Sequence, residues 1–136
     1  MDRHIILASH GNLAEGLYNA LRIILGQEKL SNVAYLNCYM EDTQNVTKEI
    51  ETMLNRYDDE ILVFTDLFGG SVNTAVYSCM EGKSFELIAG MNLPLLIETV
   101  LFQGTMQELI AHLKANSSQY IVFLNNTAPL AEDENF

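Results

Sequence analysis

Residues 4–11, His-Ile-Ile-Leu-Ala-Ser-His-Gly, decide the fold of this chain. The apolar run predicts a strand that is covered on both faces, and a helical pattern begins near Leu13, directly after Gly11. A strand that turns straight into a helix places its last residue, His10, at the carboxyl edge of the sheet. In open α/β sheets the functional groups gather at that edge.

A second segment repeats this arrangement further along the chain. An apolar run over residues 60–65 predicts another buried strand, Asp66 follows it, and Gly-Gly-Ser at 69–71 precedes a second helical pattern. If the aspartate lies beside His10, the first and third strands must be neighbours. With right-handed crossovers, the strand order 2-1-3-4 follows, and the switch point of the sheet falls between strands one and three.

The rest of the chain alternates between strand and helix patterns. Gly26 is suited to end the first helix, Thr43 and Ser71 to cap the second and third, and Pro94 to begin the fourth. The pattern therefore predicts the α/β class, with a doubly wound, mainly parallel sheet, helices on both of its faces and a fifth strand at an edge. The expected strands cover residues 5–9, 33–36, 60–65, 85–89 and 120–124.

The composition argues against several classes of function. The chain has 136 residues, enough for one domain, and 7 Lys and Arg against 18 Asp and Glu give a formal net charge of −11. Such a charge does not suit a nucleic-acid surface. No apolar stretch approaches the length of a membrane span and no signal peptide is visible, so we expect a cytoplasmic protein that is not itself in the membrane. The scattered histidines and the two isolated cysteines predict no metal site and no cofactor.

The paired strand ends predict a phosphorylatable histidine. Asp66 can accept a hydrogen bond from one ring nitrogen of His10, which leaves the lone pair of the other nitrogen free to attack phosphorus. Gly11 lets backbone N–H groups approach a ligand, and Gly69, Gly70 and Ser71 can hold phosphoryl oxygens at the start of a helix. The candidate catalytic residues are therefore the histidine and the aspartate, and the other four are candidate phosphate-binding residues.

Three blocks of sequence carry a family resemblance. Residues 6–11 (ILASHG), 64–71 (FTDLFGGS) and 89–99 (AGMNLPLLIET) resemble the IIA component of the mannose/fructose/sorbose family of the bacterial phosphoenolpyruvate-dependent sugar phosphotransferase system. The blocks follow in the family's order and at its spacing. The resemblance implies a IIA domain over residues 1–124, followed by an acidic C-terminal tail over residues 125–136.

The resemblance also implies a phosphotransferase that acts through a phosphohistidine intermediate. His10 would accept phosphate from the histidine phosphocarrier protein and donate it to a IIB component during sugar uptake, at the periphery of a membrane sugar permease. Asp66 matches the family aspartate that binds Nδ1 of the active histidine, and Ser71 matches the serine that lines the phosphate site. Members are homodimers that exchange their last strand, here about residues 120–124, as an antiparallel edge strand.

The chain departs from the family pattern at two positions, because many members have proline where Val72 stands and some have tryptophan at Phe68. Two alternatives share the chemistry: a phosphotransferase subunit that feeds dihydroxyacetone kinase, and a regulatory IIA-like protein. A receiver domain is disfavoured because Ser9 and His10 stand where its magnesium-binding acidic pair would follow the first strand. A flavodoxin-like carrier is disfavoured because its first loop should be richer in Ser and Thr.

Overall fold

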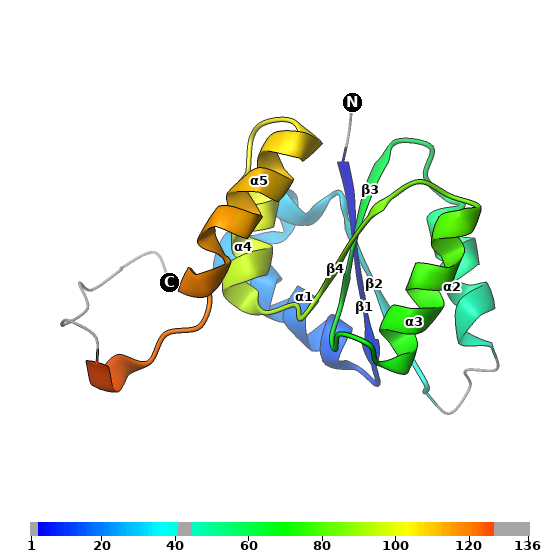
Figure 1. Ribbon diagram of the computed structural model, residues 1–136, viewed down its shortest axis with the longest axis horizontal. Coiled ribbons are helices and arrows are strands. Elements are labelled where there is room, and N and C mark those ends of the chain that lie inside the picture. Colours follow the sequence, from blue (N-terminus) through cyan, green and yellow to red (C-terminus); the bar gives the residue numbers. More distant parts are fainter. Residues whose placement is uncertain (1–2, 41–44, 127–136) are drawn as a thin grey trace.

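Four parallel strands form a single sheet in the computed structural model, which describes residues 3–40 and 45–126 (Figure 1). The order β2-β1-β3-β4 is the one predicted from the sequence, and every neighbouring pair is parallel. The strands are β1 (Arg3–His10), β2 (Val33–Cys38), β3 (Glu60–Thr65) and β4 (Glu86–Ala89).

Helices cover both faces of the sheet, as expected for a doubly wound fold. Side chains alternate along β1, so that Ile5 and Leu7 belong to one core cluster and Ile6 and Ala8 to the other. Helices α1, α4 and α5 cover the first face, and α2 and α3 cover the second (Figure 1). Their bounds are α1 (Leu13–Leu25), α2 (Val46–Leu54), α3 (Ser71–Ser78), α4 (Leu93–Leu101) and α5 (Met106–Asn116), with short 3₁₀ turns at η1 (Gln27–Leu30), η2 (Cys79–Glu81), η3 (Ser117–Gln119) and η4 (Leu124–Asn126).

Two helix caps differ from the sequence expectation. Thr43, the expected cap of the second helix, lies outside the described residues, and Asn45 caps α2 by accepting the Lys48 N–H. Ser71 is the first residue of α3 rather than its cap, a place that Gly70 takes without a side-chain bond. The Ser71 hydroxyl is therefore not needed to cap the helix, and it can face the neighbouring β1–α1 turn.

The expected fifth strand is not formed in the single chain. Residues 120–124 follow η3 without strand structure and enter η4. Tyr120 is partly buried against the core, and the four apolar side chains after it are exposed. A strand needs a neighbouring backbone for its N–H and C=O groups, but Figure 1 shows this segment leading away from β4. Of the expected acidic tail, residues 127–136 lie outside the described part of the chain.

The helices that the structure describes are all unsuited to cross a bilayer. None within residues 3–40 and 45–126 is both long and apolar enough for a membrane span.

The core of the sheet generates a test of the packing. Phe64 on β3 is fully buried between the sheet and its helices, so Phe64→Ala should lower the free energy of unfolding by about 3–5 kcal/mol. The matched control Ile23→Ala removes a side chain of α1 that is 77% exposed and should change it by less than about 0.5 kcal/mol. Urea unfolding of both variants measures the difference, and equal effects would contradict the described core.

Candidate active site

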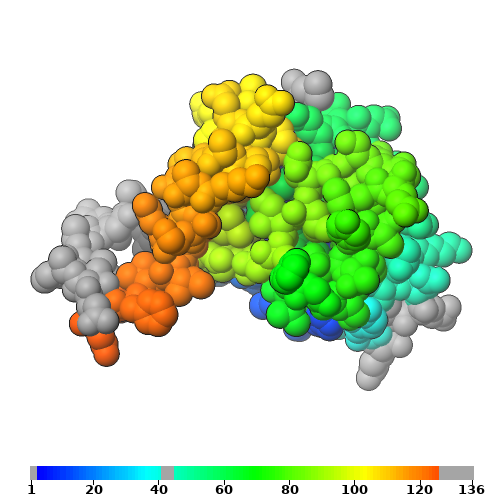
Figure 2. All heavy atoms as spheres, viewed as in Figure 1, coloured from blue at the N-terminus to red at the C-terminus, as the bar shows by residue number. Residues whose placement is uncertain are grey.

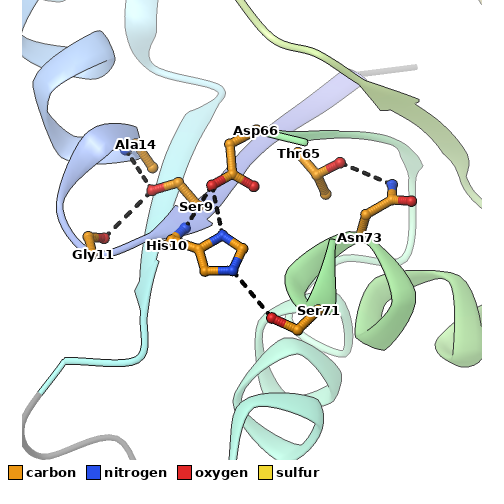
Figure 3. A network of polar contacts seen from close by, with 8 residues as sticks. All are labelled: Ser9, His10, Gly11, Ala14, Thr65, Asp66, Ser71 and Asn73. Carbon is orange, nitrogen blue, oxygen red and sulfur yellow. Dashed lines mark hydrogen bonds and ion pairs between the residues drawn. The ribbon is translucent and has the colours of Figure 1, made fainter. Parts of the chain in front are cut away.

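His10 and Asp66 meet at the carboxyl edge of the sheet. Because Ala8 of β1 pairs with Thr65 of β3, Asp66 is level with the residue before His10, and the side chain of Asp66 reaches the histidine from there. The Nδ1 atom of His10 lies 2.8 Å from Oδ2 of Asp66 (Figure 3). The backbone N–H of His10 donates to the same oxygen, also at 2.8 Å. One carboxylate oxygen thus holds both the backbone and the ring of the histidine.

This contact sets which ring nitrogen faces outward. A carboxylate accepts, so Nδ1 carries the proton and Nε2 holds the lone pair in the neutral ring. The hydroxyl of Ser71, the first residue of α3, lies 3.1 Å from Nε2 and can donate to it (Figure 3). The His10 side chain is 44% exposed and that of Asp66 only 11%, so a partner molecule can reach the imidazole but not the carboxylate behind it.

The charge on Asp66 is stabilised by the histidine. Burial by itself raises the pKa of this carboxyl. The hydrogen bonds from the backbone N–H and ring of His10, together with the electrostatic attraction of that ring, lower the pKa by more than burial raises it. The net pKa lies below the ordinary value, and Asp66 is a charged acceptor at neutral pH. It can therefore stabilise positive charge that develops on the imidazole.

A buried asparagine shapes the loop between Asp66 and Ser71. Asn73 of α3 accepts the Gly69 N–H through Oδ1 at 3.1 Å. It also donates through Nδ2 to Thr65 Oγ1 at 2.9 Å (Figure 3). It is buried, and so is the threonine at the end of β3. The start of α3 is thereby fixed against the strand that carries Asp66 into the site.

The glycines of the predicted phosphate cradle use their own N–H groups inside the protein. The Gly11 N–H donates to the Cys38 carbonyl at 2.7 Å, that of Gly70 to the Leu67 carbonyl at 3.1 Å, and that of Gly69 to Asn73. Gly11 and Gly69 have φ values of 56° and 75°, which other residues rarely adopt. These glycines therefore shape the two turns, and they bring no unused N–H group to the site.

The β1–α1 turn has its own polar brace. Ser9, fully buried at the end of β1, accepts the Ala14 N–H at 2.7 Å and approaches the Gly11 carbonyl at 3.4 Å (Figure 3). This contact holds the first turn of α1 close to the strand that ends in His10.

The other histidines lie outside the site. His4 pairs with Asp59 at 3.6 Å, and His112 pairs with Glu98 at 3.1 Å. In residues 3–40 and 45–126, no group of three or more His, Cys, Asp or Glu side chains is arranged to hold a metal ion.

Two residues beside the site were not singled out by the sequence pattern. Asn73 is buried on α3 together with Val72 and Val76, and a polar residue next to these inward apolar positions was the available signal. Tyr39 follows β2 directly, and its ring lies against His10 with 5.3 Å between the ring centroids. No sequence signal pointed to the tyrosine, because its contact depends on how β2 pairs with β1.

The lowered pKa of Asp66 predicts how stability depends on pH. A carboxylate whose folded-state pKa lies below the unfolded value stabilises the fold above the unfolded pKa, and this contribution is lost as the pH falls through the folded pKa. Asp66→Asn should therefore lower the free energy of unfolding by about 2 kcal/mol at pH 7. The loss should be much smaller at a pH well under ~4. Urea unfolding at both pH values measures this difference. Asp59→Asn, at a half-exposed carboxyl, is the control with the smaller effect. A gap between wild type and Asp66→Asn that widens on acidification would contradict the assignment.

Comparisons with known proteins agree with the geometry. The family model described as the fructose IIA component of the PTS matches residues 4–115. The sorbose-specific EIIA component of Klebsiella pneumoniae is 28% identical over 134 residues, which cover 96% of this chain and 98% of the relative.

Solved structures extend the likeness to the fold. A sugar phosphotransferase system protein from Klebsiella pneumoniae superposes with a TM-score of 0.83 at 34% identity, covering 93% of both chains. The mannose/sorbose specific IIA subunit from Enterococcus faecalis superposes with a TM-score of 0.79 at 26% identity, covering 97% of this chain and 98% of the other. The chain therefore belongs to the mannose/fructose/sorbose family of IIA components, the phosphoryl carriers of sugar uptake by the phosphotransferase system.

Proposed function

We propose that His10 is the phosphoacceptor of this IIA component and that it carries the phosphoryl group on Nε2. The observation that supports this proposal is the geometry of the ring. Nδ1 is held by Asp66 at 2.8 Å, while Nε2 faces the Ser71 hydroxyl and the side chain is 44% exposed. A fixed tautomer with an accessible lone pair is the arrangement that nucleophilic catalysis by histidine requires.

In the proposed reaction, the Nε2 lone pair attacks the phosphorus carried by the histidine phosphocarrier protein. The P–Nε2 bond forms while the bond from phosphorus to the carrier's nitrogen breaks, and the electron pair of that bond returns to the carrier. The imidazole of His10 keeps its Nδ1 proton and gains positive charge, which the Asp66 carboxylate stabilises. Transfer onward to a IIB component is the same step with His10 as the donor.

Ser71 changes its partner in this reaction. Its hydroxyl faces the Nε2 lone pair at 3.1 Å, and once the lone pair is used it can donate to a phosphoryl oxygen instead. The first turn of α3 supplies further N–H groups, because these groups have no acceptor within a helix. Since Gly11, Gly69 and Gly70 already donate inside the protein, their proposed role as phosphate-binding residues is to shape the turns around the phosphoryl group.

The proposed setting is the cytoplasmic side of a membrane sugar permease. There the protein would meet the histidine phosphocarrier protein and a IIB component in turn, at the same exposed edge of the sheet. A net charge of −11 favours association with basic surfaces on these partners.

A phosphotransfer assay tests the phosphoacceptor. With labelled phosphoenolpyruvate, the general phosphotransferase enzyme and the phosphocarrier, the wild type should gain an acid-labile, base-stable label. His10→Ala should gain none. Asp66→Asn should be labelled about 10- to 100-fold more slowly, because it loses charge-assisted hydrogen bonds to the ring.

His112→Ala is the control for this assay, since its ring lies outside the site and should leave labelling unchanged. Label on the His10→Ala variant would refute the proposal. If His10 becomes labelled but does not donate the label to a IIB component, a regulatory role is favoured over transport.

We also propose that two copies of this chain form a homodimer by exchanging the segment at 120–124. Strand β4 is hydrogen-bonded to β3 on one side, and an apolar groove of about 700 Å³ runs along β4 and α5. The exchanged segment carries four exposed apolar side chains, from 56% exposed at Val122 to 76% at Phe123. Figure 2 shows it protruding from the body of the molecule. Tyr120 already lines this groove within one chain, so the exposed residues that follow it can pair with the open edge of β4 in a second chain.

Sedimentation tests the dimer. The wild type should be dimeric at micromolar concentration, whereas Val122→Pro, which removes a backbone donor, and Phe123→Asp should be monomeric with unchanged helix content. The control Ile23→Asp changes an equally exposed apolar residue on α1 and should remain dimeric. A monomeric wild type, or a dimer that survives both substitutions, would refute the exchange.

A further inference from the structure

Tyr39 has an unusual backbone conformation for its residue type. Its φ is 59°, and of the residues at 3–40 and 45–126 it is the only one other than glycine with a positive φ. Left-handed backbone costs free energy for every L residue with a Cβ atom, and glycine would adopt it freely. Strain of this kind collects at functional sites, where the surrounding structure enforces it. Because glycine would avoid this strain, we expect the tyrosine ring to have a role at this position.

The end of β2 explains how the strain is enforced. Cys38, the last residue of β2, is fully buried and pairs in register with His10. Its carbonyl accepts the Gly11 N–H at 2.7 Å, so the end of β2 is fixed to the turn that follows the histidine. Tyr39 follows at once in a bend, and in this left-handed conformation its ring lies beside the imidazole of His10.

The tyrosine ring meets the imidazole at a position that its other neighbours leave open. Asp66 contacts Nδ1 and Ser71 contacts Nε2, and both approach the edge of the His10 ring. The Tyr39 ring packs beside the imidazole with centroids 5.3 Å apart and an interplanar angle of 31°, within the range of favourable aromatic pairs. Two edge contacts and one ring contact together fix the plane of the imidazole.

Tyr39 also bounds the space that a phosphoryl group on Nε2 would enter. An open groove of about 760 Å³ lies beside the site, and its lining includes Tyr39, Gly69 and Ser71. The serine hydroxyl marks the Nε2 side of the imidazole at 3.1 Å. The half-exposed tyrosine therefore lines the same groove as the serine that contacts Nε2.

We propose that Tyr39 is a positioning residue for the phosphohistidine, whose ring holds the His10 imidazole in plane and limits the access of water to the phosphoryl group. The proposal rests on His10 as the phosphoacceptor. The reaction it slows is hydrolysis, in which a water oxygen bonds to phosphorus, the P–Nε2 bond breaks and its electron pair returns to Nε2. Both protons of the water leave with the phosphate, and Nδ1 keeps its proton, which it still donates to Asp66.

The test compares phosphohistidine lifetimes at pH 7 in three variants of the full chain. Tyr39→Gly keeps the left-handed turn without strain and removes the ring, whereas Tyr39→Phe keeps the ring. Tyr77→Ala is the matched control, because it removes an exposed tyrosine of α3 that has no aromatic contact with His10. Each protein is labelled through the phosphocarrier and separated from it, and the release of inorganic phosphate is followed.

The glycine variant should lose its label about 2- to 10-fold faster than the wild type, the range that corresponds to the loss of one aromatic pair. The phenylalanine variant and Tyr77→Ala should match the wild type. A lifetime that is unchanged in the glycine variant, or a phenylalanine variant as labile as the glycine one, would overturn the proposal. These outcomes are distinct from a failure of the phosphoacceptor itself, which shows as label on His10→Ala.

Discussion

A single carboxylate oxygen is the constraint on which the candidate active site depends. Oδ2 of Asp66 accepts both the backbone N–H and the ring N–H of His10, each at 2.8 Å. The first bond fixes the end of β1 to the end of β3, and the second fixes the tautomer of the ring. Both require the two strands to be neighbours, so the strand order of the sheet and the chemistry of the histidine have the same cause. A different order would leave a mostly buried charge without its partner, which is strongly destabilising.

The packed sheet gives this contact its rigidity. Alternating side chains of β1 enter two separate cores, and five helices cover the two faces, so the strand ends have little freedom to shift. The turns beyond the strands would be mobile on their own. Ser9 holds the first of them, and Asn73 holds the second through Gly69 and Thr65. Functional groups on strand ends, supported by buried polar contacts, keep their geometry better than groups on free loops.

The sequence predicts the part of this arrangement that follows from periodicity and from the positions of His10 and Asp66 at matching strand ends. It predicts less where tertiary pairing decides the outcome. Ser71 is a residue type that often caps helices, yet its hydroxyl contacts the ring of His10 and Gly70 takes the cap position. Residues 120–124 have the apolar pattern of a strand, but a strand also needs a paired strand, and the pattern alone does not reveal that no strand forms there. The contact of Tyr39 with the imidazole depends on the register of β2 against β1, which no local signal encodes.

The placement of Asp66 also resolves an electrostatic conflict in the proposed carrier. A phosphoryl group brings a charge of about −1.5 to −2, and a carboxylate beside it would repel it. Asp66 instead binds the Nδ1 edge of the imidazole, so that the ring separates the two negative groups while its own positive charge lies between them. The carboxylate makes Nε2 more nucleophilic when it accepts the phosphoryl group and stabilises the ring after it has done so. A carrier must both take up and release the phosphoryl group, and the same carboxylate can hold the ring in position in both steps.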